Sequence, residues 1–184
     1  MASQQHDRPP ETILVAGLGN VLMGDDGAGP WAIRMMESRY QFPLHVTLMD
    51  LGTPGLNITS FVSGYAHMIF IDTVHGTVPG TVLTFTGDDL LNATPQARIG
   101  PHDPGVHEAL WSLELAGAAP RDVLLVGVVP DRCEMGDSIS LPIRSALPAI
   151  VTAVLAHLQA LGVAWTEKGG GTESELWWRV IGDN

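Results

Sequence analysis

The chain has 184 residues, and its 20 acidic side chains outnumber its 9 Lys and Arg side chains, which gives a formal net charge of −11. A domain of this length buries roughly 70% of its unfolded surface, so it needs no disulfide to fold. The acidic balance disfavours nucleic acid as a partner, because phosphate binding depends on Lys and Arg. Cys133 is the only cysteine, which excludes an intramolecular disulfide and a thiolate metal cluster and favours a reducing compartment.

Apolar runs alternate with helical spacings along the first part of the chain. Residues 13–16 form a predicted buried strand that ends in a glycine-containing loop, and the apolar spacing over 31–40 predicts a helix. A second strand is predicted over 45–49, followed by a turn and a short helix that ends near residue 63. This order of strand, loop and helix is typical of an α/β fold.

The second part of the chain continues this pattern, with predicted strands over 68–71, 82–85 and 123–129 and a helix over 106–116. The connection from 71 to 82 is too short for a crossover helix, so strand 82–85 is expected to run antiparallel to strand 68–71. The last helix has apolar residues at three- and four-residue steps from Leu147 to Leu161, and Pro148 either starts it or kinks it.

These elements predict a three-layer α/β/α sandwich around a mostly parallel five-stranded sheet, with one strand antiparallel. We expect a flexible N-terminus over 1–11, one domain over 12–165 and a C-terminal tail over 166–184, whose Trp177 and Trp178 pack on the domain. The N-terminal segment is polar, and no run of ~20 uncharged apolar residues is found, so we expect a cytoplasmic protein without membrane contact. We also expect a monomer.

Acidic side chains follow the predicted strands at the edge where open α/β sheets bind ligands. Asp25 and Asp26 follow the first strand, Asp50 the second and Asp72 the third, while His102 precedes the helix over 106–116. Two carboxylates and one imidazole, from Asp26, Asp72 and His102, suit a divalent first-row metal with open coordination positions. These three residues are therefore candidates for a metal site.

Structural alternatives exist for each of these residues. Either Asp25 or Asp26 could cap the following helix while the other faces the cleft. Asp72 ends an apolar strand, where a carboxylate is costly unless it is paired or exposed, and this favours a functional role. His102, between Pro101 and Asp103, could be only a rigid loop residue.

Three other chemistries are disfavoured. The loop at 17–20 lacks the third glycine of a dinucleotide-binding fingerprint, because Leu22 stands in its place. The G-x-S-x-G elbow of serine hydrolases is absent from the sequence. Cys133 would need a nearby base and positive surroundings to act as a nucleophile, so we interpret it as a loop thiol.

Five segments in this order resemble the hydrogenase maturation endopeptidase family. They are GLGNVLMGDDGAG at 17–29, DLGTPG at 50–55, Ile71-Asp72, Pro101-His102 and GVVP at 127–130. The resemblance covers residues 13–162. In it, Asp26 stands where many relatives carry Glu, and Thr53 stands where a second glycine is more usual.

The resemblance implies an endopeptidase that removes the C-terminal extension of a nickel-iron hydrogenase large-subunit precursor after nickel insertion. By motif position, Asp26, Asp72 and His102 would be both the catalytic and the metal-contacting residues, with a supporting loop set formed by Gly19, Asn20, Asp25, Asp50 and Thr53. The cofactor would be nickel that is already bound in the precursor, and the partner would be this nickel-loaded precursor.

Two alternatives remain open at this point. A non-catalytic nickel-sensing chaperone of the precursor would need the same three residues. A peptidyl-tRNA hydrolase also opens with a strand and Gly-x-Gly-Asn, but the acidic pI of about 4.8 opposes an RNA substrate.

Overall fold

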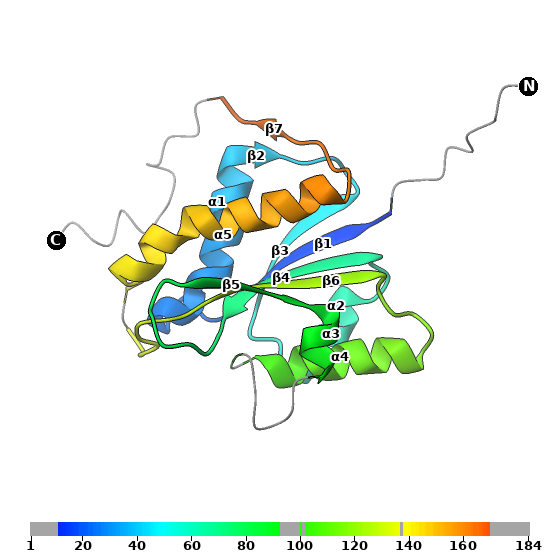
Figure 1. Cartoon of the computed structure of the whole chain (residues 1–184), viewed down its shortest axis with the longest axis horizontal. Coiled ribbons are helices and arrows are strands. Elements are labelled where there is room, and N and C mark those ends of the chain that lie inside the picture. Colours follow the sequence, from blue (N-terminus) through cyan, green and yellow to red (C-terminus); the bar gives the residue numbers. More distant parts are fainter. Residues whose placement is uncertain (1–10, 93–99, 101, 137, 170–184) are drawn as a thin grey trace, which may run out of the picture.

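A five-stranded sheet lies between two layers of helices in the computed structural model of the chain (Figure 1). The structure describes residues 11–92, 100, 102–136 and 138–169. Strand order is β3-β1-β4-β6-β5; the first four strands are parallel, and β5 pairs antiparallel with β6. The three-layer α/β fold with one antiparallel strand is therefore confirmed.

The strands and helices have the following bounds in chain order. They are β1 Ile13–Leu18, η1 Gly24–Gly27, α1 Ala28–Arg39, β2 Tyr40–Gln41, β3 Val46–Gly52, η2 Gly55–Asn57, α2 Ile58–Val62, β4 His67–Thr73, β5 Val82–Thr86, α3 Gly87–Asn92, α4 Asp103–Leu115, β6 Asp122–Val128, α5 Leu141–Ala160 and β7 Thr166–Glu167.

Alternate residues of the central strands bury against opposite helical layers. In β4, Ile69 and Ile71 pack with the apolar residues of α1 and α5, whereas Met68 and Phe70 pack with those of α2, α3 and α4. Both faces of a parallel sheet are covered in this way, which explains why β1 and β4 are continuous apolar runs. The polar residues at the ends of these strands are consequently confined to the sheet edge.

Three elements differ from the sequence-based expectation. Strand β5 has the expected direction relative to β4. It lies at the edge of the sheet, however, and its hydrogen-bonded neighbour is β6 and not β4. Helix α3 lies in a stretch for which no helix was predicted. Helix α5 begins at Leu141, six residues before Leu147, because Ser140 caps it and Pro142 fits its first turn; Pro148 lies inside the helix.

Residues just outside both predicted limits of the domain, 12 and 165, make contacts with the domain. The Glu11 carboxylate accepts a hydrogen bond from His67 Nε2 at 2.8 Å, and β7 pairs with β2 immediately after residue 165. The expectations for Trp177 and Trp178 lie outside the described residues.

By length and mean hydropathy alone, α5 is the one helix in the described part of the chain that could cross a membrane. It carries Arg144, however, and its apolar face is used inside the domain. Ile143, Leu147 and Ile150 are buried against the sheet, as in the core helix of an α/β domain.

The N-terminus of α1 lies unusually close to the sheet at Gly29. A Cβ atom at this position would lie 2.3 Å from Leu18 O and 2.4 Å from Ile71 O, and one at the facing Gly17 would lie 2.6 Å from Gly29 O. Only glycine permits this separation. The two glycines therefore set how closely the loop after β1 approaches the end of β4.

We expect Gly29→Ala to lower the free energy of unfolding by about 1–3 kcal/mol or more, because the added methyl overlaps backbone atoms that cannot move aside independently. Urea denaturation measures the change. Gly169→Ala is the matched control, since a Cβ there meets no atom within 4 Å. Equal losses in both variants would contradict the steric argument.

Candidate active site

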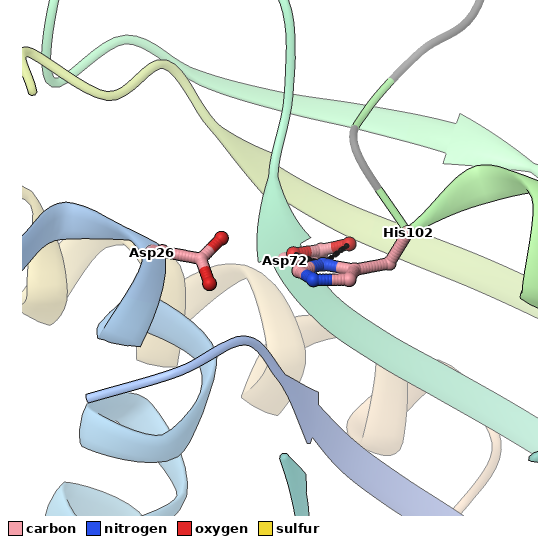
Figure 2. A group of neighbouring side chains, drawn as sticks. All are labelled: Asp26, Asp72 and His102. Atoms are coloured by element: carbon pink, nitrogen blue, oxygen red, sulfur yellow. Dashed lines mark hydrogen bonds and ion pairs between the residues drawn. The ribbon is translucent and has the colours of Figure 1, made fainter. Parts of the chain in front are cut away.

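Three of the predicted site residues lie together at the carboxyl edge of the sheet, between β1 and β4. One ligand atom each from Asp26, Asp72 and His102 lies within 4.8 Å of the other two, and we call this set the three-residue cluster. Figure 2 shows the Asp26 carboxylate facing Asp72 and His102 from the opposite side. The chain leaves β1 toward the α1 layer, and His102 is the N-cap residue immediately before α4 in the other layer, so the cluster lies where an open sheet binds ligands.

Asp72 and His102 form the closest pair in this cluster. His102 Nδ1 lies 2.9 Å from Asp72 Oδ1 and 3.0 Å from Oδ2, and the amide N–H of Thr73 donates to Oδ1 at 2.7 Å. Burial raises the pKa of Asp72 above its usual value, while the hydrogen bond and charge of His102 oppose that rise. The contact with Asp72 therefore fixes the orientation of the His102 imidazole. The burial that this requires is unfavourable for the charged form of the Asp72 carboxylate.

Asp26 is oriented by the glycine-containing loop after β1. The amide N–H of Asn20 donates to Asp26 Oδ2 at 2.8 Å, and Asn20 Oδ1 accepts from the amide of Leu22 at 3.0 Å. Gly19 has a φ of 119°, and a Cβ there would lie 1.7 Å from Asp26 O. These contacts give Gly19 and Asn20 a structural reason to support the position of Asp26.

Asp25 does not cap helix α1, so that alternative is wrong. Its side chain is fully buried and accepts four hydrogen bonds from the loop after β6: from the amides of Asp131, Arg132 and Ser140 and from the Ser140 hydroxyl, at 2.6–3.1 Å. The N-cap of α1 has no side-chain hydrogen bond. Asp25 therefore joins the loop that carries Asp26 to the N-cap of α5.

Ser140 is the site-supporting residue that sequence reasoning missed. Its hydroxyl accepts from Ile143 N at the start of α5 and donates to Asp25 Oδ2. The signal in the sequence was a serine two residues before a proline at the start of an apolar helical pattern.

The other predicted supporting residues lie outside the three-residue cluster. Asp50 is exposed at the end of β3, and its carboxylate accepts from the amide of Gly52 at 3.0 Å. Thr53 is exposed in the following loop. The backbone connects this loop to the first one, because the amide of Gly19 donates to Gly52 O at 2.9 Å.

Cys133 lies in the exposed loop after β6. Partial burial and the carboxylates of Asp26 and Asp25 raise the pKa of its thiol to about 11. A thiolate nucleophile is therefore disfavoured, which agrees with the interpretation of Cys133 as a loop thiol.

The donor atoms of the three-residue cluster are compatible with a divalent metal. Donors that lie ~2.1 Å from one ion are at most ~4.2 Å apart, so a spread of up to 4.8 Å is slightly wider than a closed coordination shell. Small side-chain movements would bring all three donors to one ion, and other coordination positions would remain open. Such a set suits contact with a metal that has further ligands elsewhere.

Solved structures and curated relatives resemble this chain in fold and in sequence. The structure of the hydrogenase maturating endopeptidase HybD from E. coli aligns with a TM-score of 0.78 and 26% identity over 85% of this chain and 98% of that one. Hydrogenase 2 maturation protease of Escherichia coli (strain K12) is 30% identical over 153 residues, 82% of this chain and 93% of that protein. Fold, relatives and site chemistry together define a peptide hydrolase.

The family can be stated more narrowly. A model described as hydrogenase maturation protease matches residues 31–157. Hydrogenase expression/formation protein HupM of Azotobacter chroococcum mcd 1 is 35% identical over 163 residues, 88% of this chain and 78% of that protein. The chain belongs to the hydrogenase maturation protease family, which confirms the resemblance of its motifs and sets aside the peptidyl-tRNA hydrolase alternative.

We expect Asp25→Ala to lower the free energy of unfolding by about 3–5 kcal/mol, because three amides and a hydroxyl would lose their buried acceptor. Chemical denaturation of the purified variant measures this loss. Asp50→Ala, which removes an exposed carboxylate with one local hydrogen bond, should cost less than about 1 kcal/mol. Similar costs for the two variants would show that Asp25 is not the main connection between these loops.

The raised pKa of Asp72 predicts a pH dependence of stability in metal-free protein. Because the folded pKa lies above the unfolded value, Asp72 contributes stability that is present below the unfolded pKa and lost as pH rises through the folded pKa. Asp72→Asn removes this dependence, so the stability of wild type relative to the variant should fall as the pH rises above the ordinary pKa range of an aspartate. Urea denaturation with a chelator tests this, with the exposed Asp88→Asn as control; a constant difference would contradict it.

Proposed function

We propose that this protein is a nickel-dependent endopeptidase that cleaves the C-terminal extension from a nickel-iron hydrogenase large-subunit precursor after nickel insertion. The observation that supports this most directly is the convergence of Asp26, Asp72 and His102 at the sheet edge in a hydrogenase maturation protease. We place the reaction in the cytoplasm and expect the enzyme to act as a monomer.

The donor set fits a metal that arrives with the substrate. The cluster offers two carboxylate donors and one imidazole donor, and its 4.8 Å spread leaves it open. Nickel bound to thiolates in the precursor would accept these additional nitrogen and oxygen donors. The enzyme would then recognise the precursor only after nickel insertion, without a tightly held metal of its own.

Each residue has a distinct part in this proposal. Asp72 holds the His102 imidazole by its Nδ1 atom, as carboxylates commonly orient metal-binding histidines. Asp26 approaches from the other side, held by the Asn20 amide. Docking of the precursor's nickel between them would place the scissile bond beside the metal, which can polarise a carbonyl or activate water.

Incubation of the purified protein with nickel-loaded and nickel-free precursor tests this function directly. We expect mass spectrometry to show C-terminal shortening of the nickel-loaded form only. Asp26→Ala and His102→Ala should each slow cleavage by about 10²-fold or more, because each removes a group that contacts the metal or substrate.

A second Asp–His pair in the same chain supplies a matched control. His157 Nε2 lies 2.6 Å from Asp122 Oδ2 at the opposite edge of the sheet. Asp122→Ala and His157→Ala should cleave within about twofold of wild type, since partly exposed pairs contribute little to stability. Cleavage that is indifferent to nickel would overturn the mechanism, and binding of the loaded precursor without shortening would indicate the chaperone.

A further inference from the structure

A small apolar pocket adjoins the three-residue cluster on the α4 side of the sheet. It has a volume of about 180 Å³, and its walls are Leu18, Pro54, Gly55, Leu56, Ile58, His102 and Gly105. Leu18 and Ile58 are buried, while Leu56 is 68% exposed at the rim. Apart from His102, the side chains that line the pocket carry no polar atom.

Two glycines bring the walls of this pocket together. A Cβ at Gly105 in α4 would lie 2.8 Å from the carbonyl oxygen of Gly55 in η2. Gly55 itself has a φ of 56°, in the region that favours glycine. The backbone of η2 is therefore held close to the first turn of α4, with Leu56 next to Gly55 in the pocket lining.

His102 belongs to both the pocket and the cluster. Its Nδ1 atom contacts Asp72, and its side chain also lines the apolar walls. A peptide whose scissile bond lies at the cluster must therefore pass within a residue or two of the pocket opening. This continuity identifies the occupant as part of the substrate segment that flanks the cleaved bond.

The size and lining of the pocket define the chemistry of that occupant. Sites for small molecules typically have volumes of ~300–1,000 Å³, so 180 Å³ suits one side chain better than a free ligand. The geometry points to a specificity subsite that receives one apolar side chain of the precursor, located within two residues of the cleaved bond. This inference rests on the proposed function, because that function places the precursor at the cluster.

A double-mutant cycle between enzyme and precursor tests the subsite. The enzyme variant is Leu56→Asp, which places a charge at the pocket rim. The precursor variant replaces the apolar residues within two positions of the cleaved bond by Ser. The Kd of fluorescently labelled, nickel-loaded precursor is measured by anisotropy, and cleavage is followed separately by mass spectrometry.

Burial of one aliphatic side chain is worth roughly a 10- to 100-fold change in Kd, so each single change should weaken binding by about that factor. The two changes together should weaken binding no more than either alone, because both remove the same contact. The matched control is Leu44→Asp, the same substitution at an exposed leucine in the loop before β3. It should bind as wild type does.

Additive effects in the cycle, equal Kd values for Leu56→Asp and Leu44→Asp, or a cleaved bond without an apolar neighbour would each overturn the subsite. Circular dichroism checks the fold of Leu56→Asp, and the Ser-substituted precursor tests the contact with unchanged enzyme. Coupled binding without any shortening would show that the pocket receives this apolar side chain of the precursor and would refute the protease function. Shortening without coupling would do the reverse.

Discussion

The position of the candidate site depends on the buried carboxylate of Asp25. It accepts hydrogen bonds from residues 106–115 positions away in the sequence and thereby joins the loop after β1 to the loop after β6. The same carboxylate binds the hydroxyl of Ser140, which caps α5. A buried carboxylate is unfavourable without such partners, and four donors compensate for its desolvation. The loop that carries Asp26 is therefore held from two sides, by this connection and by the close approach of Gly29 to the ends of β1 and β4.

Two adjacent acids consequently have different roles. Asp25 is surrounded by donors of its own chain, while Asp26 accepts a hydrogen bond from one amide and faces Asp72 on β4 and His102 at the N-cap of α4. On β4, Asp72 has less compensation, since its pKa is raised by burial in spite of the contact with His102. A carboxylate that destabilises the folded chain is expected where function, and not stability, determines the residue. The contrast between Asp25 and Asp72 distinguishes a structural acid from a candidate functional acid within one sheet edge.

The strands and the three converging residues could be predicted because their signals are local. Apolar runs identified β1 and β4. An acid in the loop that follows β1 and an acid at the end of β4 placed Asp26 and Asp72 at one edge. The neighbour of β5 could not be predicted, because the short connection from β4 determines its direction but not which edge it joins. The role of Asp25 depends on partners beyond residue 130, and no local pattern distinguishes such an acceptor from a helix cap. For α5, Ser140 and Pro142 are a local signal for the start of the helix, whereas the apolar period at three- and four-residue steps begins only at Leu147.

The residues of the three-residue cluster are positioned by both helical layers, since Asp26 precedes α1 and His102 is the N-cap residue of α4 on the opposite face. The distances between the ligand atoms of the cluster are thus determined by how both helical layers pack on the sheet and not by one loop. A slightly open spacing would be a defect in a site that had to retain a metal. Under the proposed function it is an advantage, because a tightly bound resident ion would occupy the positions that the precursor's nickel must reach. Weak affinity for free metal and strong affinity for a metal presented with a peptide are compatible when the peptide supplies the remaining contacts, including those of the apolar pocket beside His102.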